Sequence, residues 1–72
     1  MDNTQILMNI ISNIKTDNFQ AAQDDCQLLP RTRNTVSLYA TIGAIESQLT
    51  DQAFEGTKSA ALSMADCLIG QI

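Results

Sequence analysis

Apolar residues recur every three or four positions in four separate stretches of this 72-residue chain. Such spacing is typical of helices that bury one face. No stretch alternates apolar and polar residues over six positions, as a half-buried strand would. The sequence therefore predicts an all-α fold, either a small helical hairpin or a three- to four-helix bundle. We expect a single domain over residues 1–72, with helices at about 4–15, 18–29, 35–49 and 52–71 and a loop at 30–34.

The boundary between the first two stretches allows two interpretations. Thr16-Asp17-Asn18 interrupts the apolar pattern, and Asp17 with Gln20 three residues later is similar to the start of a capping box. We expect a break here, followed by a second helix. The alternative is one unbroken helix from Thr4 to Leu29.

Pro30 marks the clearest loop, because the residue before a proline is pushed out of the helical region. Either Asn34 or Thr35 is predicted to cap the third helix. This helix carries an apolar seam formed by Leu38, Ile42, Ile45 and Leu49. The apolar phase is lost after this seam, so Thr50-Asp51 is predicted to form a turn and to cap the fourth helix.

Small residues follow helical spacing in both the third and the fourth predicted helix. In the third helix they are Ala40, Gly43, Ala44 and Ser47; in the fourth they are Gly56, Ala60, Ser63 and Cys67. Small side chains let two helix backbones approach closely. The sequence therefore predicts that the third and fourth helices pack as a tight antiparallel hairpin through these two rows.

The residue types that most catalytic and metal sites need are missing. The chain has no histidine, so it has no default general base at neutral pH and no imidazole ligand. Asp24-Asp25 is its only adjacent carboxylate pair. Neighbouring positions on a helix do not face each other, so the two carboxylates would not converge on one ion. We expect no enzymatic activity, no cofactor, no metal site and no small-molecule substrate.

Charge and hydropathy narrow the range of partners. With four basic residues and a net charge of −4, the chain lacks the basic surface that binds nucleic acid. No apolar run is long enough to span a membrane, and no basic residue precedes the first apolar stretch as it would in a secretory signal. We expect a cytoplasmic protein. Arg31 and Arg33, after Pro30, either contact a carboxylate of a partner or keep the loop solvated.

The two cysteines match no metal or redox motif. Cys26 and Cys67 lie 41 residues apart, and no local basic cluster would activate either thiol. We expect both to be reduced and to act as small buried apolar residues. A disulfide between the second and fourth helices is the alternative.

The first predicted helix is apolar over more than half of its circumference, which is more surface than one small neighbour covers. A chain of this length is also marginally stable alone. Exposed apolar patches usually mark an interface, so we expect a protein partner or a homo-oligomer. The candidate partner-binding residues are Leu7, Ile10, Ile11, Ile14, Tyr39, Leu68 and Ile72.

The fourth predicted helix carries a resemblance to a known family. The residues concerned are Asp51-Gln52-Ala53-Phe54-Glu55, Ala60-Ala61-Leu62, Ala65 and Leu68-Ile69. This pattern resembles the C-terminal helix of the small needle chaperones of bacterial type III secretion systems. The resemblance implies a cytoplasmic protein that pairs with a tetratricopeptide-like partner and keeps the needle subunit from polymerising. A helical structural or regulatory protein of a phage or mobile element, which self-associates, is the alternative.

Overall fold

Four α-helices make up the fold in the computed structural model, which describes residues 2–48 and 52–72. Their bounds are α1 Asn3–Lys15, α2 Phe19–Cys26, α3 Arg33–Ser47 and α4 Phe54–Leu68. No strand occurs among the described residues. The all-α prediction of a small helical bundle is therefore confirmed.

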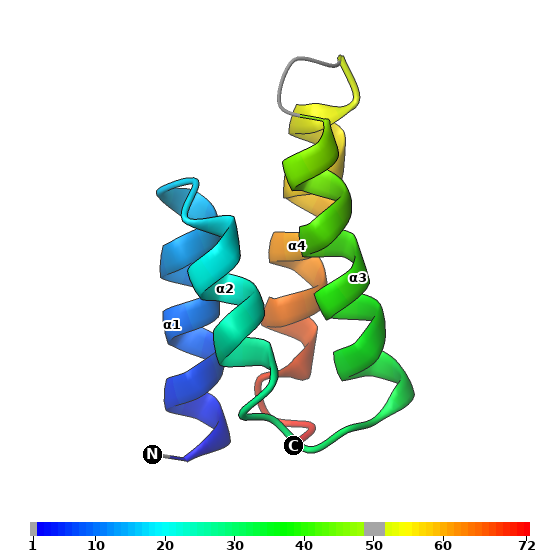
Figure 1. The fold of residues 1–72 in the computed structure, drawn as a ribbon. Helices are drawn as coiled ribbons and strands as arrows, with labels where there is room; N and C mark the ends of the chain where they lie inside the picture. Colours follow the sequence, from blue (N-terminus) through cyan, green and yellow to red (C-terminus); the bar gives the residue numbers. More distant parts are fainter. Residues whose placement is uncertain (1, 49–51) are drawn as a thin grey trace.

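The helices run alternately up and down, and each packs beside the next (Figure 1). The fourth helix also packs against the first, so the four helices surround one core. Figure 1 shows that α3 and α4 form the longer hairpin and that their upper parts extend past the α1–α2 turn. Each helix consequently has two neighbours, and this arrangement decides which residues are buried.

The core is built from the apolar stripes of all four helices. Its members are Ile6, Leu7, Ile10 and Ile14 of α1, Phe19, Ala22 and Cys26 of α2, Leu29 after it, Leu38, Ile42 and Ile45 of α3, and Ala61, Ala65 and Leu68 of α4. Within each helix they follow one another at three or four positions, the spacing that places side chains on one face. Three residues of the predicted seam are thus fully buried, while the fourth, Leu49, lies outside the described residues.

The break between α1 and α2 has a different local cause from the one predicted. Asp17 adopts φ 63°, the left-handed conformation, directly after the end of α1. The N–H of Asn18 donates to the carbonyl of Asn13 at 2.7 Å, and that of Asp17 donates to Ile14 at 3.1 Å. These two bonds form a Schellman motif, which terminates α1. Asn18, rather than Asp17, is the N-cap of α2, and its side chain makes no capping bond.

Several helix ends also differ from the sequence-based bounds. α2 ends at Cys26 because residues 27–29 continue in a tighter turn, in which each N–H bonds three residues back. The cap of α3 is Thr32 and not Asn34 or Thr35, so the helix begins at Arg33. α4 begins at Phe54 and ends at Leu68, within the predicted range. The predicted turn at Thr50-Asp51 lies outside the described residues.

The third and fourth helices form the predicted antiparallel hairpin, but the two rows of small residues do not pack against each other, so that part of the prediction is wrong. A Cβ added to Gly43 would lie 2.8 Å from Nε2 of Gln23, which places this glycine against α2 rather than α4. Ala60, Ser63 and Cys67 are exposed, and a Cβ on Gly56 would meet nothing within 4 Å. The closed arrangement explains the difference: α4 turns Ala61, Ala65 and Leu68 toward the core, and its small-residue row faces solvent.

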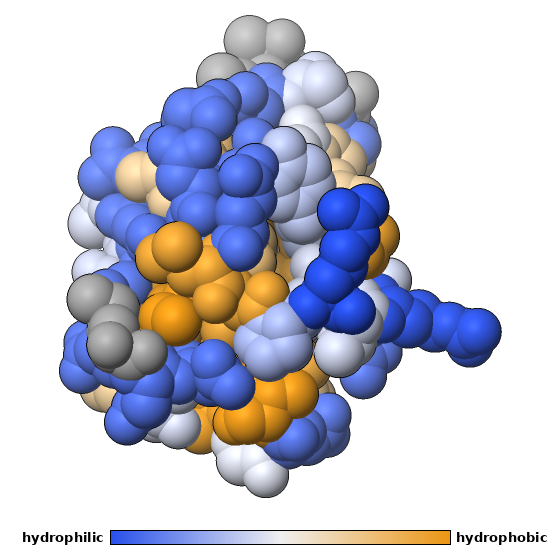
Figure 2. Space-filling view, turned by 60° about the horizontal axis from the view of Figure 1, so that its bottom comes forward, coloured by the Kyte–Doolittle hydropathy of each residue, from blue (hydrophilic) through white to orange (hydrophobic). Residues whose placement is uncertain are grey.

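One end of the bundle holds the starts of α1 and α3, the end of α2 and the C-terminal residues (Figure 1). Figure 2 shows apolar surface on this end, bordered by hydrophilic side chains. Ile69 and Ile72, which follow α4, are half-buried here and pack against the core. This end therefore combines chain connections with apolar side chains that are incompletely covered.

Candidate functional site

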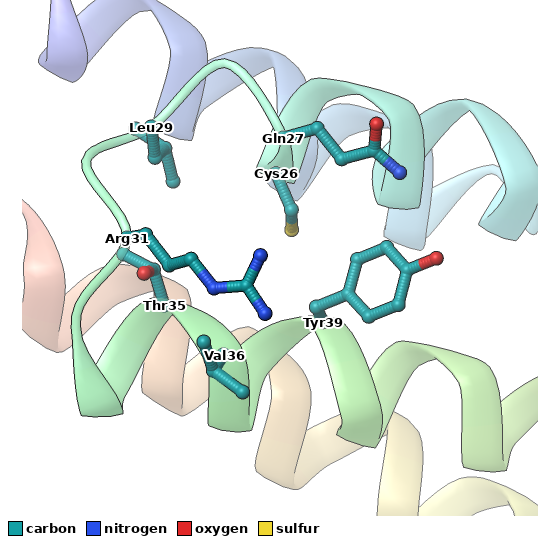
Figure 3. A pocket seen from close by; sticks show the side chains of 7 residues that line it. All are labelled: Cys26, Gln27, Leu29, Arg31, Thr35, Val36 and Tyr39. Carbon is teal, nitrogen blue, oxygen red and sulfur yellow. The ribbon is translucent and has the colours of Figure 1, made fainter.

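A groove opens between the end of α2 and the first half of α3 (Figure 3). It has a volume of about 530 Å³. The residues that line it are Cys26, Gln27, Leu29, Arg31, Thr35, Val36 and Tyr39. We call it the α2–α3 groove.

The connection between the two helices is fixed by hydrogen bonds of a buried threonine. Oγ1 of Thr35 donates to the carbonyl of Pro30 at 2.7 Å and accepts from the N–H of Thr32 at 2.8 Å. The N–H of Thr35 in turn donates to Oγ1 of Thr32 at 3.2 Å. This reciprocal pair is a capping box that starts α3. Thr35 is only 4% exposed, so these hydrogen bonds fix the backbone beside the groove from its buried side.

Arg31 is the one charged residue among those that line the groove, and its side chain is exposed. Figure 3 shows the guanidinium extending between the Cys26 thiol on one side and Val36 and Tyr39 on the other. Within the described parts of the chain, the guanidinium has no hydrogen-bond or ion-pair partner. Asp24 and Asp25, the nearest acids of α2, accept from Gln20 and Asn13 instead. The guanidinium of Arg31 is therefore free to bind an anionic group of a partner.

Exposed large apolar side chains concentrate at this groove. Among the described residues they are Leu28 (62% exposed), Met8 (54%), Val36 (45%) and Tyr39 (38%). Val36 and Tyr39 line the groove, and Leu28 lies in the chain between the lining residues Gln27 and Leu29. The amide of Gln23 donates to the Tyr39 carbonyl at 3.3 Å, which joins α2 to α3 beside the groove. Only Met8, on α1, lies elsewhere.

Cys26 contributes a thiol that points into the groove (Figure 3) but is not activated. Desolvation by burial and, second, the charge of Asp25 raise its pKa from the ordinary 9.0 to about 11. The thiol is therefore protonated at neutral pH and is a weak nucleophile. Both cysteines are free, but Cys67 is exposed, so the prediction that both are buried is correct only for Cys26.

The structure separates the predicted partner-binding residues into three groups. Leu7, Ile10, Ile14 and Leu68 are in the core, and the first three have no exposed surface. Ile11 and Ile72 are half-buried at its edge. Tyr39 alone is exposed, at the groove.

Four of these residues are therefore unavailable to a partner while the chain is folded, which corrects the sequence-based assignment. The reason is that α1 packs against both α2 and α4, whereas the sequence argument allowed it one small neighbour. Its apolar stripe is covered within the chain itself, and Met8 is the exception.

Val36 and Leu28 are exposed residues that are absent from the set predicted from the sequence. Val36 lies two positions before Leu38, out of phase with the seam, and three before Tyr39. Residues three apart share a side of a helix. An apolar pair at that spacing outside the seam is the signal that indicates a second, exposed apolar face on α3.

Comparison with known proteins gives no match to a family model, a curated protein or a solved structure. In the described parts of the chain, no three histidine, cysteine or acidic side chains gather to form a metal site. None of the helices described is both long enough and apolar enough to cross a membrane.

Proposed function

We propose that this protein is a protein-interaction module that binds its partner over the α2–α3 groove. The observation that carries the proposal is the pairing of exposed apolar side chains: of the four large ones in the described residues, Val36 and Tyr39 line the groove, and Leu28 lies between two lining residues in the chain. Single exposed apolar residues are normal on any surface, but a cluster marks a contact site. Tyrosine, here Tyr39, is also enriched among residues that dominate binding energy.

The chemistry of the groove supports binding rather than catalysis. Its thiol is protonated, and its remaining polar groups are an amide, a hydroxyl used in the capping box, a phenol and a guanidinium. Gln27, Arg31, Val36 and Tyr39 are exposed, so the groove is open to solvent along this side. An open groove between two helices suits side chains that project from a segment of another protein.

The chaperone-type role in the cytoplasm that the resemblance of residues 51–69 implies is part of this proposal. In α4 the matching Ala61 and Ala65 pack into the core. The α2–α3 groove is formed by other helices, so a tetratricopeptide-like partner would bind the α2–α3 face while α4 holds the bundle together.

The proposal is tested by affinity capture from the native cytoplasm, with quantitative mass spectrometry. The wild type is compared with Val36→Asp, which places a charge on the exposed groove wall. Met8→Asp is the matched control, because Met8 is also exposed and apolar but lies on α1 and does not line the groove.

We expect at least one protein to be recovered with the wild type and with Met8→Asp and to be lost with Val36→Asp. Circular dichroism of the three proteins checks that all of them are folded. Capture that is the same for all three, or lost equally with both variants, would contradict binding at the groove.

A further inference from the structure

We infer that the α2–α3 groove selects a partner segment in which an aspartate or glutamate lies beside apolar side chains, and that Arg31 is the specificity-determining residue. The inference rests on the proposed function and adds the chemistry of the partner. It starts from the guanidinium of Arg31, which extends across an otherwise uncharged groove and has no partner within the described residues (Figure 3).

A guanidinium favours a carboxylate at such a place. It presents its N–H donors in a planar fork that matches the two oxygens of a carboxylate, and it is weakly hydrated, so contact costs little desolvation. Apolar walls on both sides, from Leu29 and Val36, reduce the water that competes for these donors once the groove is filled.

The net charge of −4 does not prevent an acidic segment from binding. Exposed charges interact weakly beyond about 8 Å at physiological salt, so distant acids contribute little to the potential in the groove. The two acids nearest in α2, Asp24 and Asp25, accept hydrogen bonds from Gln20 and Asn13. Arg31 is the one charged side chain that lines the groove, while the charge of Asp25 acts from beside it, as the raised pKa of Cys26 shows.

A second copy of this chain fits the groove less well than a different protein. In a two-fold symmetric dimer the same patch meets itself. If the groove faces met in this way, the two Arg31 side chains would approach each other across an apolar contact, with no acid of the groove to separate them. Like charges that meet at an interface are unfavourable. A partner segment with an acidic residue would meet Arg31 with the opposite charge, so this repulsion would not arise.

The experiment is a selection of peptides from a random display library on the folded wild-type protein, repeated on Arg31→Gln and Arg31→Glu. Arg33→Gln is the matched control, because Arg33 is also exposed and two residues away but does not line the groove. Tyr39→Ala reports whether a selected peptide occupies the groove at all. Circular dichroism confirms that each variant is folded.

We expect the wild type and Arg33→Gln to enrich peptides with an acidic residue within one helical turn of apolar residues. Arg31→Gln should lose this acidic preference, and Arg31→Glu should replace it with a preference for Lys or Arg. A peptide selected on the wild type should bind Arg31→Gln about two- to fivefold more weakly, and this difference should shrink as salt is raised.

The two proposals fail in distinguishable ways. If peptides are enriched and lost with Tyr39→Ala but show no acidic preference, the groove binds proteins and the inference about Arg31 is wrong. If no peptide depends on Tyr39, the proposed function is wrong as well. If the wild type sediments as a dimer that Val36→Asp dissociates, a second copy occupies the groove, which overturns the inference.

Discussion

Nζ of Lys58, on α4, lies 2.8 Å from Oδ1 of Asp17, the residue with φ 63° that follows the end of α1. The same ammonium group is 5.7 Å from the centre of the Phe54 ring. That ring meets the ring of Phe19 edge-on, with 5.9 Å between their centres. One lysine thus connects the α1–α2 turn to α4, at a place where the backbone itself is strained.

Substitutions of Asp17 distinguish the energetic contribution of its ion pair from that of its left-handed backbone conformation. Asparagine tolerates the left-handed conformation almost as well as aspartate, so Asp17→Asn should lower the free energy of unfolding only by the ion pair, about 0.2–1 kcal/mol, and less at high salt. In a Lys58→Met background the pair is already absent, and Asp17→Gly should then stabilise the fold by about 0.5–1 kcal/mol. Urea denaturation followed by circular dichroism measures both. Destabilisation by Asp17→Gly in that background would argue against strain at this residue.

Ile10 distinguishes the core from a partner surface. Its side chain has no exposed area, so Ile10→Ala leaves a cavity and should cost about 2–4 kcal/mol of unfolding free energy. Ile11→Ala, at the half-buried edge of the core, should cost about 1 kcal/mol. Chemical denaturation gives both values. If the two variants lost the same unfolding free energy, or if Ile10→Ala changed sedimentation without changing stability, Ile10 would belong to a partner interface and not to the core.

Thr35 links the stability of the bundle to the shape of the groove. Thr35→Val keeps the volume of the side chain but leaves the Pro30 carbonyl and the Thr32 N–H without their hydroxyl partner. We expect a loss of about 1–3 kcal/mol. Thr35→Ser keeps the hydroxyl and should lose much less. Thermal unfolding of the two variants decides between a role of the hydroxyl and a role of the methyl group.

The two thiols should differ in their reaction with an alkylating reagent. Cys67 is exposed and should be modified first, while Cys26 is buried and its pKa is raised to about 11. The folded state thus favours the protonated Cys26 thiol. Its contribution to stability is fully present below pH 9.0 and is lost as the pH rises toward about 11. Mass spectrometry after timed alkylation tests the order, and fast labelling of Cys26 at neutral pH would contradict it.

The pH dependence needs a separate comparison. In a Cys67→Ser background, Cys26→Ala should remove the part of the alkaline destabilisation that this thiol causes. Denaturation series of the two proteins at neutral and at alkaline pH, run side by side, measure the difference. Identical alkaline slopes would show that Cys26 does not titrate differently in the folded and unfolded chains.

Much of the fold follows from the apolar pattern alone. The spacing of Leu38, Ile42 and Ile45 identifies the buried side of α3, since only a helix brings these positions to one face. The N-cap of α3 is harder to predict, because Thr32, Asn34 and Thr35 are all suitable capping residues. The choice depends on which hydroxyl reaches the Pro30 carbonyl, and that is a contact of the folded chain.

The candidate site could be predicted only in part. Tyr39 can be predicted because it lies off the seam, whereas the sequence assigns the core residues of α1 to a partner because no local pattern shows that α4 covers them. A sequence pattern indicates which side of a helix is apolar. Whether another helix of the same chain or a second protein covers that side depends on how the hairpins close.

The closed, sequential arrangement of the helices has a consequence for folding kinetics. Three of the four extensively packed helix pairs, α1 with α2, α2 with α3 and α3 with α4, join segments that are neighbours along the chain. Bundles dominated by such short-range contacts fold within about microseconds to milliseconds. The pairing of α1 with α4 must close a loop that spans most of the chain, at an entropic cost that the other pairs do not have. We therefore expect rapid formation of the two hairpins, with their docking through α1 and α4 as the rate-limiting event.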